Sequence, residues 1–360
     1  MIESVFTETI FEQLADHLVR FSPGDELEPL SGGLLNQVWR VRGRPGSVPE
    51  TVIVKWAPPY IASAPEVPFD PARLAVEASA LQAFSSGGLL AAVDTRDVRP
   101  PLFYGFEEEE SLLFMEDAGP FPNVAGWLNG VSVTEQNVDR TGAALGAFIG
   151  SLHRISARQP ELRKVFDNRS IQATRLDLQY SQIGKYAHLA GLRDAETLGQ
   201  TALVLGKRLQ EPGYCVIMGD LWPASIIPTD SGIRIIDWEL AHYGRPAQDI
   251  GHLTAHLWMQ FHRAQNHRFA NFVWLLLRRF LESYRKALGS DFERLFGLGG
   301  LEESAIHFGS EVLTRTVGIF QQGYLYEGLS RDDDLVQEAV QVAAMHIRRP
   351  LDVETFIPFR

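Results

Sequence analysis

The sequence predicts an α+β fold of two lobes, with an antiparallel sheet in the N-terminal lobe and mainly helices in the C-terminal lobe. Before residue 118, short β-branched runs alternate with turn-forming residues, which is typical of antiparallel strands. After residue 135, apolar residues recur mostly with the period of a helix. Residues 214–251 differ because two short apolar runs flank a turn there. With 360 residues, 45% of them hydrophobic, the chain is long enough for a core in each lobe.

The first residues predict a helix followed by a pair of strands. Residues 1–21 combine early acids with an amphipathic helical period, unlike the basic and uniformly apolar run of a signal peptide. Residues 30–41 then predict a strand, a turn at Gly32 and Gly33, and a returning strand. Glycines at such a turn let backbone N–H groups approach phosphate oxygens, although a glycine pair between strands more often forms only a hairpin.

A lysine inside a predicted strand is the next notable feature. Residues 51–56 are a β-branched run that contains Lys55, one of only five lysines in the chain. Such a lysine either serves a site or lies at a sheet edge with its ammonium in water. A proline-rich link over residues 57–71 leads to a helix predicted over residues 72–81, which carries Glu77.

A second hairpin is predicted over residues 101–117, with its four glutamates at a solvated turn. We place the boundary between the lobes near Ala118, which gives lobes of residues 1–117 and 118–360.

The second half is predicted to be mostly helical to about residue 344. A helix over residues 135–155 carries glycines every four residues, which predicts close packing against another helix. His153 near its end is expected to be a hydrogen-bonded core or helix-end histidine rather than a ligand. Residues 160–210 are helical by period and carry no chemical signature. His252 and His256 have the i, i+4 spacing of some zinc sites, but no third soft ligand or His-Glu motif accompanies them.

The stretch at residues 214–251 brings acidic side chains together. A turn over residues 229–232 would place Pro228 opposite Ile233, and Ser225 opposite Ile236. In that register Ser225, Asp237 and Glu239 meet the loop of Asp220 at one end of the hairpin. Gathered carboxylates repel one another unless a cation lies between them, and oxygen ligands suit Mg²⁺. The alternative is a hairpin whose acidic ends are simply solvated.

Three motifs in this stretch resemble a known family. They are GDLWPAS at 219–225, IDWE at 236–239 and YGRPAQD at 243–249. Together they resemble the catalytic core of the aminoglycoside phosphotransferase and choline kinase family. Ser225 and the Asp-x-Glu motif are similar to its methylthioribose kinase branch, which includes the fungal hydroxytryptamine kinase. Met218 and Ser225 depart from the His and Asn that are usual in the broader family.

The resemblance extends over residues 30–318 and implies a protein-kinase-like fold that binds ATP and Mg²⁺ and phosphorylates a small-molecule hydroxyl. In that arrangement Asp220 orients or deprotonates the acceptor, and Asp249 caps its helix or braces the catalytic loop. The resemblance implies metal ligands at Asp237, Glu239 and Ser225.

The same resemblance implies the remaining site residues. Lys55, held by Glu77, would neutralise the ATP phosphates. Residues expected to close over ATP or to contact its adenine are Gly32, Gly33, Asn36, Met115 and Glu116. Arg315 and Trp222 are expected on the substrate side, although Thr314 stands where the methylthioribose kinases have a first arginine.

Composition limits the partners. The net charge of −12 and the lack of a basic cluster argue against nucleic acid. No apolar run approaches the roughly 20 residues of a membrane span. The single cysteine, Cys215, fits a reducing compartment, so we expect a cytoplasmic monomer or homodimer. Two alternatives remain open: a nucleotide-binding pseudokinase, favoured by Met218 and Ser225, and a helical interaction protein with no nucleotide site.

Overall fold

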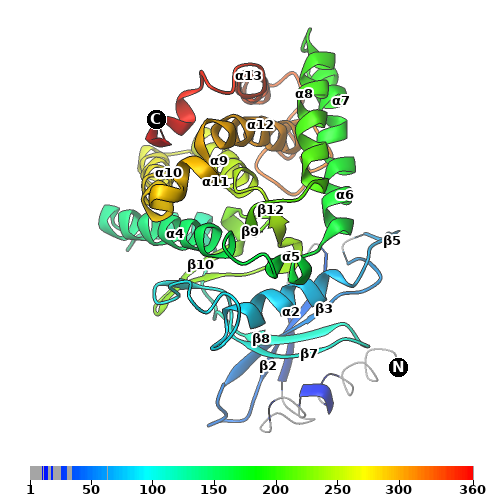
Figure 1. Cartoon of the computed structure of the whole chain (residues 1–360), viewed down its shortest axis with the longest axis vertical. Helices are drawn as coiled ribbons and strands as arrows, with labels where there is room; N and C mark the ends of the chain where they lie inside the picture. Colours follow the sequence, from blue (N-terminus) through cyan, green and yellow to red (C-terminus); the bar gives the residue numbers. More distant parts are fainter. Residues whose placement is uncertain are drawn as a thin grey trace.

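The computed structural model describes residues 10, 12–14, 18, 26–30, 35–62 and 64–359, and it forms the predicted two-lobed α+β fold (Figure 1). The N-terminal lobe contains a five-stranded antiparallel sheet in the order β1-β2-β3-β8-β7. Its strands are β1 (Glu26–Pro29), β2 (Gln37–Arg42), β3 (Thr51–Trp56), β7 (Phe103–Glu107) and β8 (Leu112–Glu116). The predicted N-terminal helix and the turn at Gly32 and Gly33 lie mostly or wholly outside the described residues.

Alternation along β3 decides which way its side chains face. Val52 and Val54 pack with Phe114 on one face of the sheet, whereas Ile53 joins the larger core on the other face. Lys55 shares the face of Ile53 because successive strand residues point to opposite sides. Helix α2 (Arg73–Phe84) covers this face and lies between the sheet and the helical lobe (Figure 1).

The proline-rich link contains strands that the sequence did not predict. Strands β4 (Tyr60–Ile61) and β5 (Ala64–Pro68) pair antiparallel in a sheet of their own. Prolines are tolerated there because a two-stranded ribbon has only edge strands, where a missing N–H breaks no ladder.

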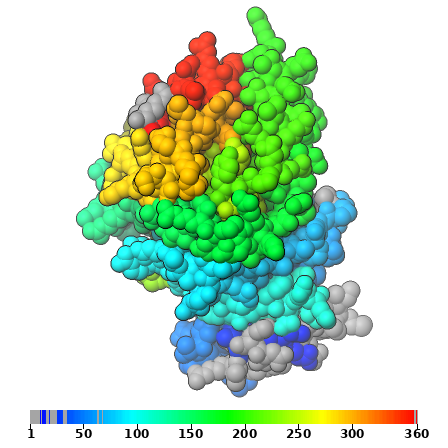
Figure 2. Space-filling model, in the orientation of Figure 1, coloured from blue at the N-terminus to red at the C-terminus, as the bar shows by residue number. Residues whose placement is uncertain are grey.

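The C-terminal lobe is mainly helical, and Figure 2 shows it directly above the blue and cyan N-terminal lobe. Its helices are α3 (Val124–Leu128), α4 (Glu135–Ser156), α5 (Leu162–Val165), α6 (Arg169–Leu178), α7 (Ile183–Leu189), α8 (Ala195–Lys207), α9 (Ala247–His262), α10 (His267–Leu288), α11 (Phe292–Leu295), α12 (Gly297–Thr316) and α13 (Asp334–Arg348). None of the helices among the described residues is long and apolar enough to span a membrane.

The predicted close packing of the residue 135–155 helix is confirmed. The glycines of α4 face α10, and a Cβ atom added at Gly146 would lie 2.2 Å from the carbonyl oxygen of Phe280. Any larger residue would push these helices apart.

The central hairpin has the predicted register. Strands β10 (Ile226–Thr229) and β11 (Gly232–Ile235) place Pro228 opposite Ile233. Beyond the ladder, the Ile236 N–H donates to the Ser225 carbonyl over 2.9 Å. Two further pairings were not predicted: β6 (Val98–Arg99) joins β11 in parallel, and β9 (Cys215–Ile217) pairs with β12 (His242–Gly244).

Candidate active site

The lysine of β3 and the glutamate of α2 form a buried ion pair. Lys55 Nζ lies 2.7 Å from Glu77 Oε2, and both side chains are almost completely buried. The other oxygen, Glu77 Oε1, accepts a hydrogen bond from the Trp238 N–H over 3.2 Å. Burial alone would lower the pKa of Lys55, but the carboxylates of Asp237, Glu77 and Glu239 outweigh it and hold the pKa well above its ordinary value. The lysine therefore stays charged, and Glu77 ties it to the segment that follows β11.

Asp237 adopts a backbone conformation that is uncommon for a residue with a side chain. Its φ of 64° and ψ of 61° are left-handed. Strained residues of this kind concentrate at functional sites. Here Asp237 Oδ1 lies 2.9 Å from Lys55 Nζ, while the side chain remains 44% exposed. One oxygen thus faces the lysine, and the side chain is still accessible to a ligand.

The loop that carries Asp220 is held in place by Asp249. Asp249 is fully buried near the start of α9 and accepts hydrogen bonds from the Met218 N–H (2.8 Å) and the Gly219 N–H (2.9 Å). Gly219 has a φ of 77°, and a Cβ atom there would lie 2.3 Å from the Leu240 carbonyl oxygen. The predicted bracing role of Asp249 is confirmed, and the loop lies directly against the segment that follows Asp237.

His153 belongs to the same support. Its Nε2 lies 3.3 Å from Asp249 Oδ2, and its Nδ1 lies 3.0 Å from the hydroxyl of Tyr284. It is fully buried, so the prediction of a hydrogen-bonded core histidine is confirmed.

An arginine contacts Asp220, and no sequence pattern predicts this contact. Arg175 of α6 donates from Nη2 to Asp220 Oδ1 over 2.7 Å, and from Nη1 to Gln179 over 3.3 Å. Burial would lower the pKa of Arg175, but Asp220 and Glu311 raise it above its ordinary value. Residues 160–210 carry no motif, so only the three-dimensional pairing reveals this contact.

Glu239 is bound by the N-terminal lobe. Asn36 Nδ2 lies 2.9 Å from each carboxylate oxygen, and Arg73 donates from Nε to Oε2 over 3.1 Å. Arg73 Nη2 also donates to the side-chain oxygen of Asn36 over 2.9 Å. All three side chains are buried. The predicted site residues Asn36 and Glu239 are therefore in contact. Arg73 belongs to the same hydrogen-bonded cluster, and the sequence did not reveal it.

Ser225 lies in the core beneath the loop. It is fully buried, and its hydroxyl donates to the Trp222 carbonyl over 2.9 Å. Among the described residues there is no group of three or more His, Cys, Asp and Glu side chains arranged to hold a metal ion. Mg²⁺ is usually held by one or two carboxylates together with substrate phosphates and water, so the accessible carboxylate of Asp237 fits it without a complete protein cage.

Glu116 at the end of β8 links the two lobes. Its carboxylate accepts hydrogen bonds from Arg99 (2.7 Å to Oε1) and from Arg234 of β11 (3.3 Å). Its own N–H donates to the Leu102 carbonyl over 2.9 Å. Met115 is buried beside it. Any adenine contact at the end of β8 must therefore use other backbone groups than this N–H.

The predicted substrate residues meet near Asp220, whose charge raises the pKa of Arg315. The guanidinium of Arg315 in α12 lies 5.2 Å from the ring centroid of Trp222, and its Nε donates to Glu311 Oε1 over 2.8 Å. The Thr314 hydroxyl donates to the backbone of its own helix and is buried. His256 bonds to Tyr324 and Glu311, and His252 bonds to Tyr180.

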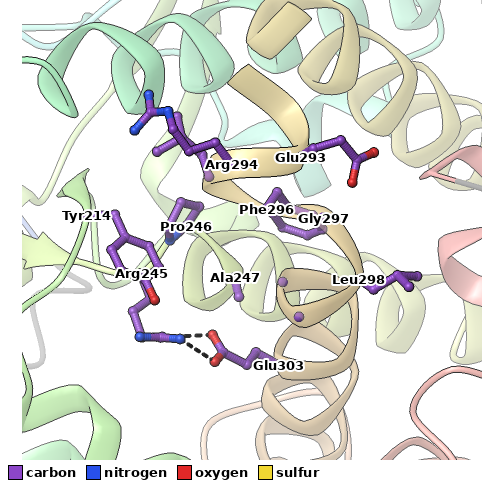
Figure 3. A pocket seen from close by; sticks show the side chains of 13 residues that line it. Tyr214, Arg245, Pro246, Ala247, Glu293, Arg294, Phe296, Gly297, Leu298 and Glu303 are labelled. Carbon is purple, nitrogen blue, oxygen red and sulfur yellow. Dashed lines mark hydrogen bonds and ion pairs between the residues drawn. The ribbon is translucent and has the colours of Figure 1, made fainter. Parts of the chain in front are cut away.

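A separate pocket lies in the C-terminal lobe (Figure 3). It measures about 360 Å³ and lies between the start of α9 and the segment from α11 to α12. Arg245 and Glu303 form a two-bonded ion pair on its wall, with distances of 2.7 and 2.9 Å. None of the predicted site residues lines it.

The Lys55–Glu77 pair, the accessible Asp237 and the braced loop of Asp220 lie together, which is the arrangement expected of a kinase-like phosphotransferase site. The model of the phosphotransferase enzyme family (APH) matches residues 26–294, and the chain belongs to that family. The predicted resemblance is thereby confirmed.

Two relatives share one name and similar coverage. The 4-hydroxytryptamine kinase of Psilocybe cyanescens is 27% identical over 68% of this chain and 71% of its own length. The enzyme of the same name from Psilocybe cubensis is 25% identical over 66% of this chain and 69% of its own length.

Solved structures agree in fold. A choline kinase from Cryptosporidium parvum gives a TM-score of 0.57 at 13% identity and covers 98% of both chains. An amicoumacin kinase in complex with AMP-PNP gives 0.56 at 15% identity, covering 97% of this chain and 96% of its own. The fold is kinase-like, and the chain is a small-molecule kinase that transfers a phosphoryl group from ATP to a hydroxyl.

Proposed function

We propose that Asp220 orients the acceptor hydroxyl while Lys55 neutralises the α and β phosphates of ATP. The observation that carries this assignment is the buried Lys55–Glu77 pair, whose ammonium also reaches Asp237. The acceptor oxygen attacks the γ phosphorus, the bond to the β-γ bridging oxygen breaks, and ADP leaves with that oxygen. The hydroxyl proton passes to Asp220 or to water. The protein has little covalent chemistry to perform in this reaction, so positioning of the reactants and electrostatic stabilisation supply most of the rate enhancement.

Mg²⁺ is the divalent ion that we propose for this site. Asp237 would hold it through the oxygen that does not face Lys55, and the ion would neutralise charge on the phosphates. Glu239 and Ser225 stay predicted ligands, but their present partners, Asn36 with Arg73 and the Trp222 carbonyl, favour a supporting role.

The remaining nucleotide contacts are proposed from position. Asn36 follows the predicted turn at Gly32 and Gly33 in sequence, and its bond to Glu239 would hold the start of β2 beside the proposed phosphate site. Adenine would lie at the end of β8, against Met115 and Glu116. This end also supports the proposed lobe boundary of residues 1–117 and 118–360, since α3 begins only at Val124.

The acceptor is proposed to lie on the side of Asp220 where Arg315 and Trp222 meet. Both named relatives are kinases of an aromatic hydroxyl compound, so phenols are candidates beside sugar and amino alcohols. We further propose that the chain acts in the cytoplasm as a monomer or homodimer. A net charge of −12 supports the absence of a nucleic-acid partner.

The test is an ADP-release assay on Asp220→Asn with a panel of small hydroxyl compounds. We expect turnover to fall by roughly 10²–10⁴-fold, because the amide cannot accept a proton. The matched control is Asp230→Asn at the exposed hairpin turn, which should leave turnover unchanged. Unchanged turnover in Asp220→Asn, with the fold intact by circular dichroism, would refute the assigned role.

A further inference from the structure

Arg315 occupies an aromatic cage. Its guanidinium carbon lies 5.2 Å from the ring centroid of Trp222, 5.2 Å from that of Phe320 and 5.1 Å from that of Tyr324. Aromatic faces attract cations because their π electrons are negative, and cages of this kind bind ammonium ligands in other proteins. Here the chain fills the cage with its own cation.

The end of this guanidinium has unused donors. Only Nε of Arg315 is hydrogen-bonded, to Glu311, and within the part of the chain that the structure describes Nη1 and Nη2 donate to no residue. The side chain is 13% exposed, so these N–H groups are not sealed in the core. Burial would lower the pKa of Arg315, but Glu311 and Asp220 raise it, so the charge persists. A guanidinium with two free nitrogens is the geometry that binds a carboxylate or phosphate through two parallel bonds.

The carboxylates on this side of Asp220 already have partners. Glu311 accepts from Arg315 through Oε1 and from Gln179 through Oε2 (2.7 Å), and His256 lies 3.1 Å from Oε1. Asp220 is paired with Arg175 through Oδ1. Two acids thus face two arginines. Among the described residues, an ammonium group on this side would find Glu311 already paired and the rings of the cage already facing Arg315, which leaves it only the second oxygen of Asp220.

Resting on the proposed function, we infer that the acceptor carries an anionic group, a carboxylate or a phosphate ester, which binds Nη1 and Nη2 of Arg315. Its hydroxyl end reaches the free oxygen of Asp220. Phe320, 38% exposed beside the guanidinium, offers an apolar surface to the body of the same molecule. The charge of the acceptor would then differ from that of the amine for which the two relatives are named.

Sets of related hydroxyl compounds whose end group is anionic, neutral or, in two of the sets, cationic test this inference. One set is 4-hydroxyphenylacetate, its amide and tyramine; a second is glycerate, glyceramide and 3-amino-1,2-propanediol; a third is glycerol 3-phosphate with glycerol. Phosphoryl transfer from Mg-ATP is measured as kcat/KM for every compound. We expect an anionic compound to exceed its neutral and cationic partners by at least roughly tenfold, the effect of one good charge-assisted contact.

Variants of Arg315 separate recognition from folding. Arg315→Gln should raise KM for the preferred anion at least roughly tenfold and should abolish the preference over the amide, whereas Arg315→Lys should retain part of it. The control is Arg331→Gln, an exposed residue outside the cage, which should change neither. The melting temperature of each variant shows whether it is folded.

A preference for an amine or a neutral compound, with transfer that depends on Asp220, would overturn this inference and leave the proposed function intact. The inference also fails if no anionic compound is phosphorylated while Mg-ATP still raises the melting temperature. By contrast, the absence of any Mg-ATP shift together with no transfer to any compound would count against the proposed function itself.

Discussion

Replacing Asp249 by Asn tests whether the catalytic loop depends on one buried carboxylate. The two oxygens of Asp249 accept the Met218 and Gly219 N–H groups over 2.8 and 2.9 Å. Asn keeps the shape but has a single acceptor oxygen, so one N–H loses a charge-assisted bond and faces an NH₂ group. Losing that bond and leaving the buried N–H unsatisfied should together lower the free energy of unfolding by roughly 3–5 kcal/mol. Typical domains are stable by about 5–15 kcal/mol, so the variant should still fold.

Urea unfolding gives the stability, and ADP release gives the activity. We expect kcat to fall by about 10²-fold, because a shift of about 1 Å in the position of Asp220 is enough for such a loss. The control, Asp230→Asn, removes a carboxylate of the exposed hairpin turn and should match the wild type. If Asp249→Asn unfolds within about 1 kcal/mol of the wild type and keeps its kcat, the bracing argument is wrong.

Three further changes test packing, titration and charge. Gly146→Ala should lower the free energy of unfolding by roughly 1–3 kcal/mol, because its Cβ would meet a backbone oxygen of α10. Gly299→Ala has open space around its Cβ, so it should instead raise the free energy of unfolding by up to about 1 kcal/mol. Equal effects in urea unfolding would contradict this. Burial holds the pKa of His307 well below its ordinary value of 6.5. Below pH 6.5 the unfolded chain therefore binds a proton that the folded chain does not. The free energy of unfolding should decrease as the pH is lowered. In urea unfolding between pH 7 and 5, His307→Asn should reduce that slope, by up to about 1.4 kcal/mol per pH unit below pH 6. An unchanged slope would disprove it. Arg175→Gln should lower the rate constant of phosphoryl transfer at least roughly tenfold, because the charge beside Asp220 is lost, and Arg175→Lys should be less affected. Single-turnover assays measure this rate constant. An unchanged value would mean that the contact is only structural.

The elements and the hairpin register could be predicted because they depend on local chemistry. Turn residues set which positions of β10 and β11 face each other, and that register alone placed Ser225 opposite Ile236. The Lys55–Glu77 pair was expected from the family resemblance, in which a lysine in a strand pairs with a glutamate in the next helix, and the two side chains do form an ion pair. The β4–β5 pair was missed because prolines argue against strands, and a short ribbon without a central strand escapes that rule.

The partners of the buried acids could not be predicted in the same way. Arg175 and Arg73 lie on helices whose periods look ordinary, and their roles depend on which distant carboxylate the fold brings to them. Arg175 pairs with Asp220 from 45 positions away, and Arg73 pairs with Glu239 from 166 positions away. No rule of sequence spacing predicts contacts between residues so far apart in the chain. An arginine withdrawn from water is costly without a partner, so the low exposure of these two side chains, 1% for Arg73 and 13% for Arg175, is a structural feature that the sequence does not show.

The charges on the two sides of Asp220 differ, and the difference indicates where a metal belongs. Among the described residues, the carboxylates of Glu77, Glu239 and Asp237 form ion pairs only with Lys55 and Arg73, so on the proposed nucleotide side carboxylates outnumber cations by one. On the acceptor side the acids are matched by arginines one for one. A surplus acid of this kind holds the pKa of Lys55 well above its ordinary value. A divalent cation bound at Asp237 would remove that surplus, whereas the same ion on the acceptor side would meet Arg175 and Arg315. The arrangement therefore favours the proposed metal site beside the phosphates of ATP and the proposed anion site on the acceptor side.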